Sequence, residues 1–309
     1  MSRFRPNPPP PRDGLNPSCV VVPAGRWDNA LAFMVQRFKA VAPQDWQTRL
    51  DAGDVVDCDG QPVRAYSPVQ IGQRLYYYRA VPTEQPVPFQ EHILWQDDDL
   101  VVADKPHFLP VIPSGKYVRE TLLVRLSKTL NTSTLAPIHR IDRDTAGIVL
   151  FSRNPATRNL YAKMFREHAL KKTYHAIARW NPDLPWPVTR HTRIEEGDHF
   201  MQQAEVPGMP NALSTIRPLA HHGQWALYEL KPVTGQRHQL RVHMQALGLP
   251  ILGDGIYPAL TPEGSRDFNN PLQLLAQAIA FTDPVTRVEQ QFESRFTLRD
   301  LHSLTDCTE

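Results

Sequence analysis

An aspartate between two arginines is the feature of this sequence best suited to chemistry. In the stretch PIHRIDRDTAGIVLF, residues 137–151, Asp142 lies between Arg140 and Arg143, and Asp144 follows before a strand-like apolar run. A carboxylate acts as a nucleophile or a base only while it is ionised, and a nearby guanidinium lowers its pKa by favouring the charged form. The residues admit two interpretations: a catalytic aspartate kept charged by arginines, or a structural ion pair at a turn.

Two other stretches carry side chains suited to an anionic substrate. In TGQRHQLRVH, Arg237 and Arg241 are four residues apart, which places them on one face of the helix predicted there. A guanidinium offers a planar pair of donors to a carboxylate or a phosphate. In KKTYHAI, Tyr174 follows two lysines, a combination that suits stacking on an unpaired base. Taken singly, each residue also fits a structural role.

The charge of the chain is concentrated in one segment. The whole chain carries a net charge of +2, but residues 121–180 contain eleven Lys/Arg and three acids, a local excess of +8. An excess of that size favours binding to a polyanion, with a solvated basic face as the alternative.

Metal and phosphate-loop chemistry are not indicated. His238 and His243 are five residues apart, which does not place them on one helix face, and no cluster of acids or cysteines completes a ligand set. Neither GxGxxG nor a Walker-type sequence occurs. Three cysteines are scattered singly, without the spacing of a metal site or a disulfide framework. We expect no metal and no cofactor.

The hydropathy of the chain points to a cytoplasmic protein. No apolar run approaches the roughly 20 residues of a membrane span. The N-terminus lacks the apolar stretch of a secretory signal. We therefore expect a cytoplasmic protein with no membrane partner, and a monomer by default.

These residues need a scaffold, and 309 residues are enough for two domains. Residues 1–18 are proline-rich and are predicted to be a disordered tail. Residues 19–86 form a compact module with a helix in 29–41, a hairpin around Asp59 and Gly60, and a closing strand. Prolines at 82–88 mark a linker, and a second domain follows over 88–300.

Helices in the second domain are predicted from their caps and apolar stripes. One spans residues 154–172, with Asn154 as N-cap and Leu160, Met164 and Phe165 facing inward. Another starts at a Thr234 cap and ends at Gly248; its apolar face consists of Leu240, Met244 and Leu247. Strands and helices mix without βαβ alternation, which favours an α+β fold over a doubly wound sheet.

Four stretches together resemble a known family. HRIDRDTAGIVLFSRN and VTGQRHQLRVHMQALGLPILGDGIYP closely resemble the two signatures of the RluA-type RNA pseudouridine synthases. KKTYHAI resembles the short element between them, and DDDLVVADKP resembles the entry strand of the same domain. All four occur in the family's order across residues 88–285, and residues 19–86 resemble an S4-type RNA-binding domain. The resemblance implies a catalytic domain with a mixed, largely antiparallel sheet and a small N-terminal S4-like module.

The resemblance implies an isomerase that converts a uridine in structured ribosomal or transfer RNA to pseudouridine without a cofactor. By position in the signatures, Asp142 is the essential aspartate, Arg241 is its ion-pair partner, and Tyr174 stacks on the target base. Arg140 is expected to help displace the target nucleotide. Further substrate-binding positions are Arg143, Leu240 and Arg237.

The sequence departs from the family pattern at three places. The family commonly has Gly two residues after Lys-Pro, whereas His107 and Phe108 follow here; Ala146 and Gln236 replace a frequent Ser and a basic residue. The S4-like module is charge-balanced, with seven basic and seven acidic residues between positions 20 and 85. Two other hypotheses stay open: a noncatalytic RNA-binding or RNA-chaperone protein that keeps the fold, and a metal-dependent hydrolase that uses the histidines.

Overall fold

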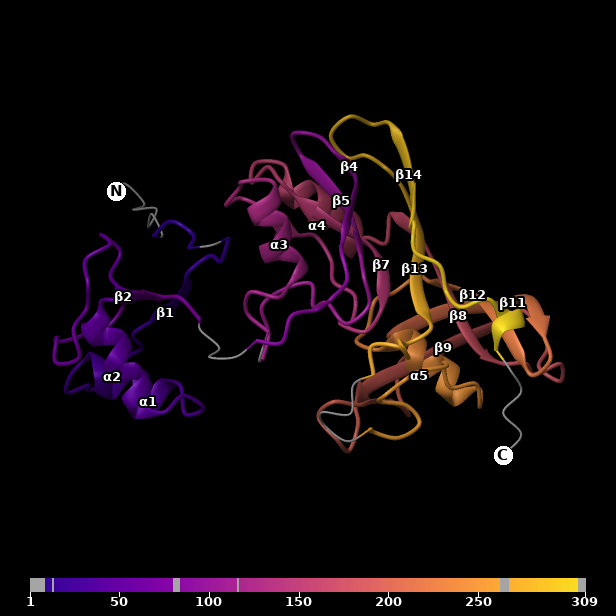
Figure 1. Ribbon diagram of the computed structural model, residues 1–309, viewed down its shortest axis with the longest axis horizontal. Helices are drawn as coiled ribbons and strands as arrows, with labels where there is room; N and C mark the ends of the chain where they lie inside the picture. Colours follow the sequence, from indigo (N-terminus) through magenta and orange to yellow (C-terminus); the bar gives the residue numbers. More distant parts are fainter. Residues whose placement is uncertain (1–8, 13, 80–83, 116, 262–266, 305–309) are drawn as a thin grey trace. The chain divides into compact units, whose positions relative to one another are not determined.

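The computed structural model describes residues 9–12, 14–79, 84–115, 117–261 and 267–304 (Figure 1). The chain divides into two compact units: Met1–Gln85 with Pro113–Ser133, and Pro86–Ile112 with Thr134–Glu309. This division places residues 113–133 with the first unit, whereas the sequence-based boundaries of 19–86 and 88–300 stay a prediction. Of the predicted tail, residues 1–8 and 13 lie outside the described residues.

The first unit is a small sheet with helices. Strands β1 (Ser18–Val21), β3 (Arg74–Tyr77) and β2 (Val55–Val56) pair antiparallel in that order and share an apolar core with α1 (Ala30–Arg37) and α2 (Pro43–Ala52). Helix α3 (Leu122–Thr129) belongs to the same unit and lies outside that core. The Asn29 side chain accepts the Ala32 amide at 2.9 Å and caps α1, which confirms the helix predicted in residues 29–41. Large apolar side chains such as Phe33, Trp46 and Leu75 fill its core.

The second unit is built on one large sheet, which confirms the predicted mixed α+β class. Its path runs β10-β9-β11-β12-β8-β13-β7-β5-β4, with β14 on β13 and β6 on β7; every described pair is antiparallel except β7–β13. The strands are β4 (His92–Gln96), β5 (Leu100–Lys105), β6 (Ala136–Pro137), β7 (Ala146–Ser152), β8 (Leu170–Arg179), β9 (Val188–Glu196), β10 (Gln203–Val206), β11 (Ala212–His222), β12 (Trp225–Pro232), β13 (Leu274–Thr282) and β14 (Glu289–Glu293). Helices α4 (Arg158–Arg166) and α5 (Gln239–Ala246) and the 3₁₀ turn η1 (Leu301–Ser303) complete it.

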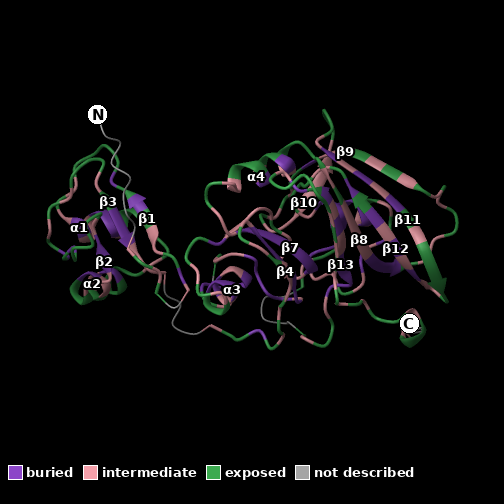
Figure 2. Ribbon diagram, turned by 90° about the horizontal axis from the view of Figure 1, so that it is seen from above, coloured by how far each residue is buried: buried purple, intermediate pink, exposed green. Residues whose placement is uncertain are grey.

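Strand β7 lies between β5 and β13 in the large sheet and is buried along its whole length (Figure 2). Its apolar run AGIVLFS suits a strand with neighbours on both sides, here β5 and β13. The loop that carries Asp142 leads directly into it. Helix α5 lies against strands β9, β10 and β11 and buries Leu240 and Met244. The two signature segments are therefore anchored in different apolar clusters of the same unit: Ile148 and Leu150 of β7 in one, and Leu240 and Met244 of α5 in another.

Helix α4 begins later than the sequence predicted. It starts at Arg158, and Asn154 is not its N-cap: the Asn154 side chain instead accepts the Ala156 amide at 2.9 Å in a turn before the helix. The predicted inward position of Leu160 is also wrong, since 45% of its surface is exposed, whereas Tyr161 and Met164 are buried. Tyr161 therefore takes the buried place predicted for Leu160, while Met164 and Phe165 pack inward as predicted.

Helix α5 likewise starts at Gln239 rather than after a Thr234 cap. The Thr234 hydroxyl accepts the Leu213 amide at 2.8 Å and donates to the Gln239 side chain at 2.7 Å, so it ties the preceding loop to β11. No helix among the described residues is long and apolar enough to cross a membrane.

Gly147 is the position in β7 that tolerates no side chain. Its φ is +108°, and a Cβ built there would lie 2.7 Å from the Ala276 nitrogen on β13 and closer still to the Ala276 carbonyl oxygen. We expect Gly147→Ala to lower the free energy of unfolding by at least about 3 kcal/mol, because backbone atoms must move. Urea unfolding measures this. The matched control is Gly248→Ala, at φ +72° with no atom within 4 Å, which should cost about 1 kcal/mol of strain alone. Equal losses in the two variants would contradict the packing argument.

Candidate active site

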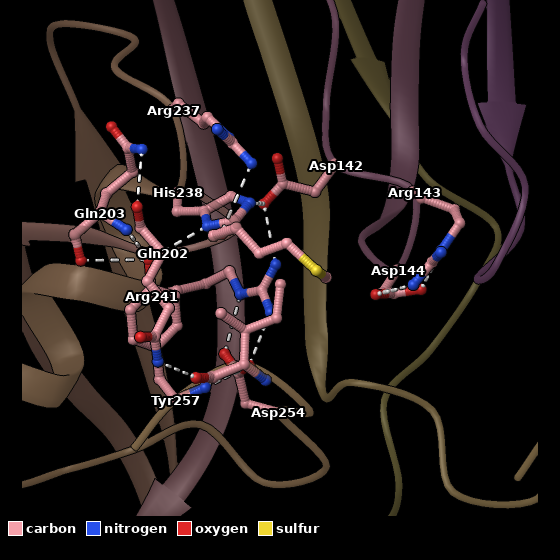
Figure 3. Close-up of polar contacts among 12 residues, drawn as sticks. Asp142, Arg143, Asp144, Gln202, Gln203, Arg237, His238, Arg241, Asp254 and Tyr257 are labelled. Atoms are coloured by element: carbon pink, nitrogen blue, oxygen red, sulfur yellow. Dashed lines mark hydrogen bonds and ion pairs between the residues drawn. The ribbon is translucent and has the colours of Figure 1, made fainter. Parts of the chain in front are cut away.

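A buried arginine joins two segments that are far apart in the chain. Arg241 on α5 donates from Nη1 to Oδ2 of Asp142, in the loop before β7, at 3.2 Å (Figure 3). The Arg241 side chain is 2% exposed and that of Asp142 is 27% exposed. The structure therefore brings together the carboxylate and the arginine that the sequence singled out, and leaves the carboxylate accessible.

The remaining donors of Arg241 bind a second carboxylate, that of Asp254. Its two oxygens accept from Nε at 2.8 Å and from Nη2 at 2.6 Å, a planar two-bond arrangement. Asp254 is itself fixed, because Oδ1 also accepts the amides of Ile256 and Tyr257. Asp254 was not predicted as a site residue from the sequence; the available signal was an acid between two glycines, Gly253 and Gly255, within the second signature.

The electrostatics of Arg241 follow from this double pairing. Burial by itself would lower the pKa of Arg241, but the charges of Asp254 and Asp142 outweigh burial and raise it. The guanidinium is therefore a permanent positive charge held in one orientation. An ionised and partly exposed carboxylate beside it has the properties of a nucleophile or a base.

His238 lies between Asp142 and the Tyr257 hydroxyl. His238 Nε2 lies 3.9 Å from Asp142 Oδ2, and its Nδ1 lies 3.0 Å from the Tyr257 hydroxyl. Burial lowers the pKa of His238, although Asp142 opposes the shift, so the neutral ring is favoured. From the sequence, His238 was weighed only as a metal ligand, and Tyr257 was not predicted as a site residue.

The arginines adjacent to Asp142 in sequence do not hold it. Arg143 makes two hydrogen bonds to Asp144, Nε to Oδ1 at 2.8 Å and Nη2 to Oδ2 at 2.9 Å, and Arg140 is exposed. Burial would raise the pKa of Asp144, but Arg143, with Arg241 and Lys105, lowers it. The expectation that the arginines next to Asp142 in sequence pair with it was wrong. Arg143 pairs with Asp144 instead, and the positive charge beside Asp142 comes from the distant Arg241.

The turn after β5 holds the segment that follows Asp142. Lys105 Nζ donates to the carbonyls of Pro106 and Arg143, each at 2.9 Å, and His107 Nδ1 donates to the Asp144 carbonyl at 2.7 Å. Burial lowers the pKa of Lys105 to about 7 and that of His107 to about 4. The backbone carbonyls of Arg143 and Asp144 are therefore held in place by hydrogen bonds from Lys105 and His107.

Phe108 occupies the place where the family commonly has glycine, and the turn keeps a glycine-like conformation. Its φ is +66°, a region that is costly for a large side chain. The ring is buried, with centroids 6.0 Å from Phe89 and 5.1 Å from Phe268. Aromatic packing therefore stabilises a turn in which Phe108 has a left-handed backbone conformation.

The other predicted site residues are placed as follows. Tyr174 on β8 is half-buried against the cluster that contains Leu240, and burial together with the charge of Asp142 raises the pKa of its phenol. Leu240 is itself a buried core residue. Arg237 precedes α5 and does not share a helical face with Arg241; it is exposed and donates to the Phe200 carbonyl at 3.0 Å.

The described residues offer no group of three or more His, Cys, Asp or Glu that could hold a metal ion. The chemistry available to this site from the described side chains is that of an ionised carboxylate, a fixed guanidinium and a phenol ring.

Comparison with known proteins gives a consistent result. Residues 99–246 match the family described as RNA pseudouridylate synthase. Over 232 residues the chain is 35% identical to an uncharacterized RNA pseudouridine synthase of Synechocystis sp., which covers 74% of this chain and 78% of that protein. It is 30% identical to the ribosomal large subunit pseudouridine synthase D of Borreliella burgdorferi, covering 53% of this chain and about half (54%) of that relative. The solved structure of human RNA Pseudouridylate Synthase Domain Containing 4 aligns with a TM-score of 0.52 and 27% identity, covering 67% of this chain and 88% of that one.

The buried Lys105 predicts a pH dependence of stability. Its pKa is lowered to about 7 in the folded protein, so between about pH 7 and 10 the unfolded chain binds more protons, and folding becomes more favourable as pH rises. We expect the unfolding free energy of the wild type to rise relative to Lys105→Met by up to about 1.4 kcal/mol per pH unit in that window. Urea unfolding of both proteins at several pH values measures the difference. Parallel pH profiles would show that Lys105 keeps its proton in the folded state.

Proposed function

Because this chain belongs to the RNA pseudouridine synthase family and is an isomerase, we propose that Asp142 is its essential catalytic carboxylate. We further propose that its substrate is a specific uridine of structured ribosomal or transfer RNA. The observation that carries the assignment is the Arg241–Asp142 ion pair at 3.2 Å, with Arg241 fixed by Asp254. It places a fixed positive charge against a partly exposed carboxylate, at a site that would receive a polyanionic substrate.

The reaction balances without a cofactor. The N1–C1′ bond of uridine breaks, the uracil turns, and C5 bonds to C1′; the hydrogen on C5 leaves as a proton and N1 takes one up. Asp142 either attacks C1′ or first assists loss of a ribose proton. Both routes require an ionised carboxylate at this position.

The target nucleotide has to leave the RNA stack before Asp142 can reach its ribose. Flipping costs a few kcal/mol, part of which stacking on Tyr174 would return. The raised pKa of Tyr174 keeps its phenol neutral, which supports a stacking role more than removal of the C5 proton by a phenolate. The exposed Arg140 and Arg237 would contact the RNA directly. Arg143, which bonds Asp144, and the buried Leu240 would support the site without touching the RNA.

The RNA class is supported by the relatives. The Borreliella relative is named for the large ribosomal subunit, and the chain spans about half (54%) of its length. The first module, with its three-stranded sheet, is proposed to be S4-like over residues 19–86 and to recognise RNA shape rather than charge, since its charges balance. A cytoplasmic monomer remains the prediction.

Tritium release tests the proposed reaction without knowledge of the target. RNA labelled with [5-³H]uridine, taken from cells that lack the gene, should release tritium with the wild type and at least about 1,000-fold more slowly with Asp142→Asn. The affinity of Asp142→Asn for RNA should stay within about threefold, because the change is isosteric. Mapping by carbodiimide and primer extension then names the site. Equal release by the two proteins would exclude the catalytic role of Asp142.

Asp254→Asn tests whether the second carboxylate positions Arg241. We expect kcat to fall about 10- to 100-fold with KM little changed, because Arg241 loses its fixed orientation toward Asp142. The matched control is Asp283→Asn, another buried carboxylate, which bonds the Tyr161 hydroxyl at 2.8 Å and two backbone amides. Both variants should lose stability, and only Asp254→Asn should lose kcat. A similar kcat in both would assign Asp254 a purely structural role.

A further inference from the structure

The loop between β9 and β10 exposes an aromatic side chain that the proposed mechanism does not use. Phe200 has 67% of its surface exposed, while the Met201 side chain beside it joins a buried cluster with Ile194 and Tyr257. The exposed ring is available to contact a ligand, while the loop that carries it is anchored by its neighbour.

Hydrogen bonds anchor this loop to the residues around Asp142. The Phe200 carbonyl accepts from Arg237 Nη1 at 3.0 Å, and the Gln203 amide donates to the Tyr257 hydroxyl at 2.7 Å. The same hydroxyl lies 3.0 Å from His238 Nδ1, and His238 Nε2 lies 3.9 Å from Asp142. A continuous chain of contacts therefore links the Phe200 loop to the catalytic carboxylate; Figure 3 shows its Gln203, His238 and Asp142 members.

Contacts inside the loop also hold its conformation. The His199 carbonyl accepts the Gln202 amide at 2.7 Å, and its Nδ1 accepts the Met201 amide at 3.2 Å. The His199 and Phe200 rings lie with centroids 4.6 Å apart at an angle of 36°. Phe200 is therefore presented by a pre-arranged turn, so little conformational entropy is lost when it binds.

The chemistry around Phe200 indicates which part of an RNA it would meet. The same hairpin carries Glu195, Glu196 and Asp198, and of these Glu195 pairs with Arg193 at 2.8 Å. These acids repel phosphates, whereas Arg237, which donates to the Phe200 carbonyl, attracts them, so the aromatic ring rather than the local charge favours a base as the partner of Phe200. A base offers an uncharged face, and stacking of bases on aromatic side chains depends little on sequence.

We propose that Phe200 stacks on an unpaired base that flanks the flipped uridine, and thereby selects uridines whose neighbour is unpaired. This rests on the proposed RNA isomerase function. Flipping the target removes a stacking partner from its neighbour, and Phe200 would replace that partner.

The test combines turnover with a direct stacking signal. In tritium release from labelled RNA of cells lacking the gene, Phe200→Ala should raise KM about 5- to 100-fold with kcat little changed, and Phe200→Trp should restore KM. The control Val288→Ala, which trims another exposed apolar side chain (55% exposed) in the β13–β14 turn, should leave KM unchanged. Because stacking involves no phosphate, the ratio of KM values should be the same at low and high salt.

A second measurement does not depend on turnover. A short oligouridylate that carries 2-aminopurine beside its central uridine should change fluorescence on binding Asp142→Asn, and this change should disappear when Phe200→Ala is added. An unaltered KM together with an unaltered fluorescence signal would overturn the proposal. If the wild type releases no tritium, the isomerase function fails, and the fluorescence signal alone then decides whether Phe200 stacks on a base.

Discussion

The second unit depends on one buried charge, the guanidinium of Arg241. Burying a cation is tolerable only when it is paired and hydrogen-bonded, and Arg241 meets that condition with Asp254 and Asp142. The three residues come from α5, from the loop after it and from the loop before β7. The pairing therefore fixes the relative placement of both signature segments, and the accessible carboxylate is a consequence of that placement.

The carboxylate pair has an asymmetry that suits catalysis. Asp254 is 1% exposed and takes two of the three hydrogen bonds of Arg241, whereas Asp142 is 27% exposed and takes one. Asp254 therefore orients the arginine, and Asp142 keeps capacity to interact with a substrate. Lys105 and His107 bond the carbonyls of Arg143 and Asp144, so the loop that carries Asp142 is held both by Arg241 and by these two residues.

Buried strands and helices could be predicted from the sequence, because their pattern lies within one segment. Side-chain bonds between residues that are distant in the chain could not. The apolar run of β7 and the stripe of α5 predicted buried elements, because periodicity reports which face meets the core. Asn154 and Thr234 were wrongly predicted as caps, because their side chains bond residues that are distant in the chain, Asp99 and Leu213. Phe108 took a glycine-like φ, since Phe89 and Phe268 pack on it from distant positions.

The mixed fold class and the two signature segments, with Asp142 in one and Arg241 in the other, could be predicted because they follow from patterns of side-chain types along the chain, and the family resemblance implied that these two residues pair. Only the tertiary structure decided which charges face each other. Arg143 is one residue from Asp142 and pairs with Asp144, while Arg241, 99 residues away, binds Asp142. Ion pairs depend on distances of a few ångströms between side-chain atoms, and those distances are fixed by packing rather than by separation along the chain.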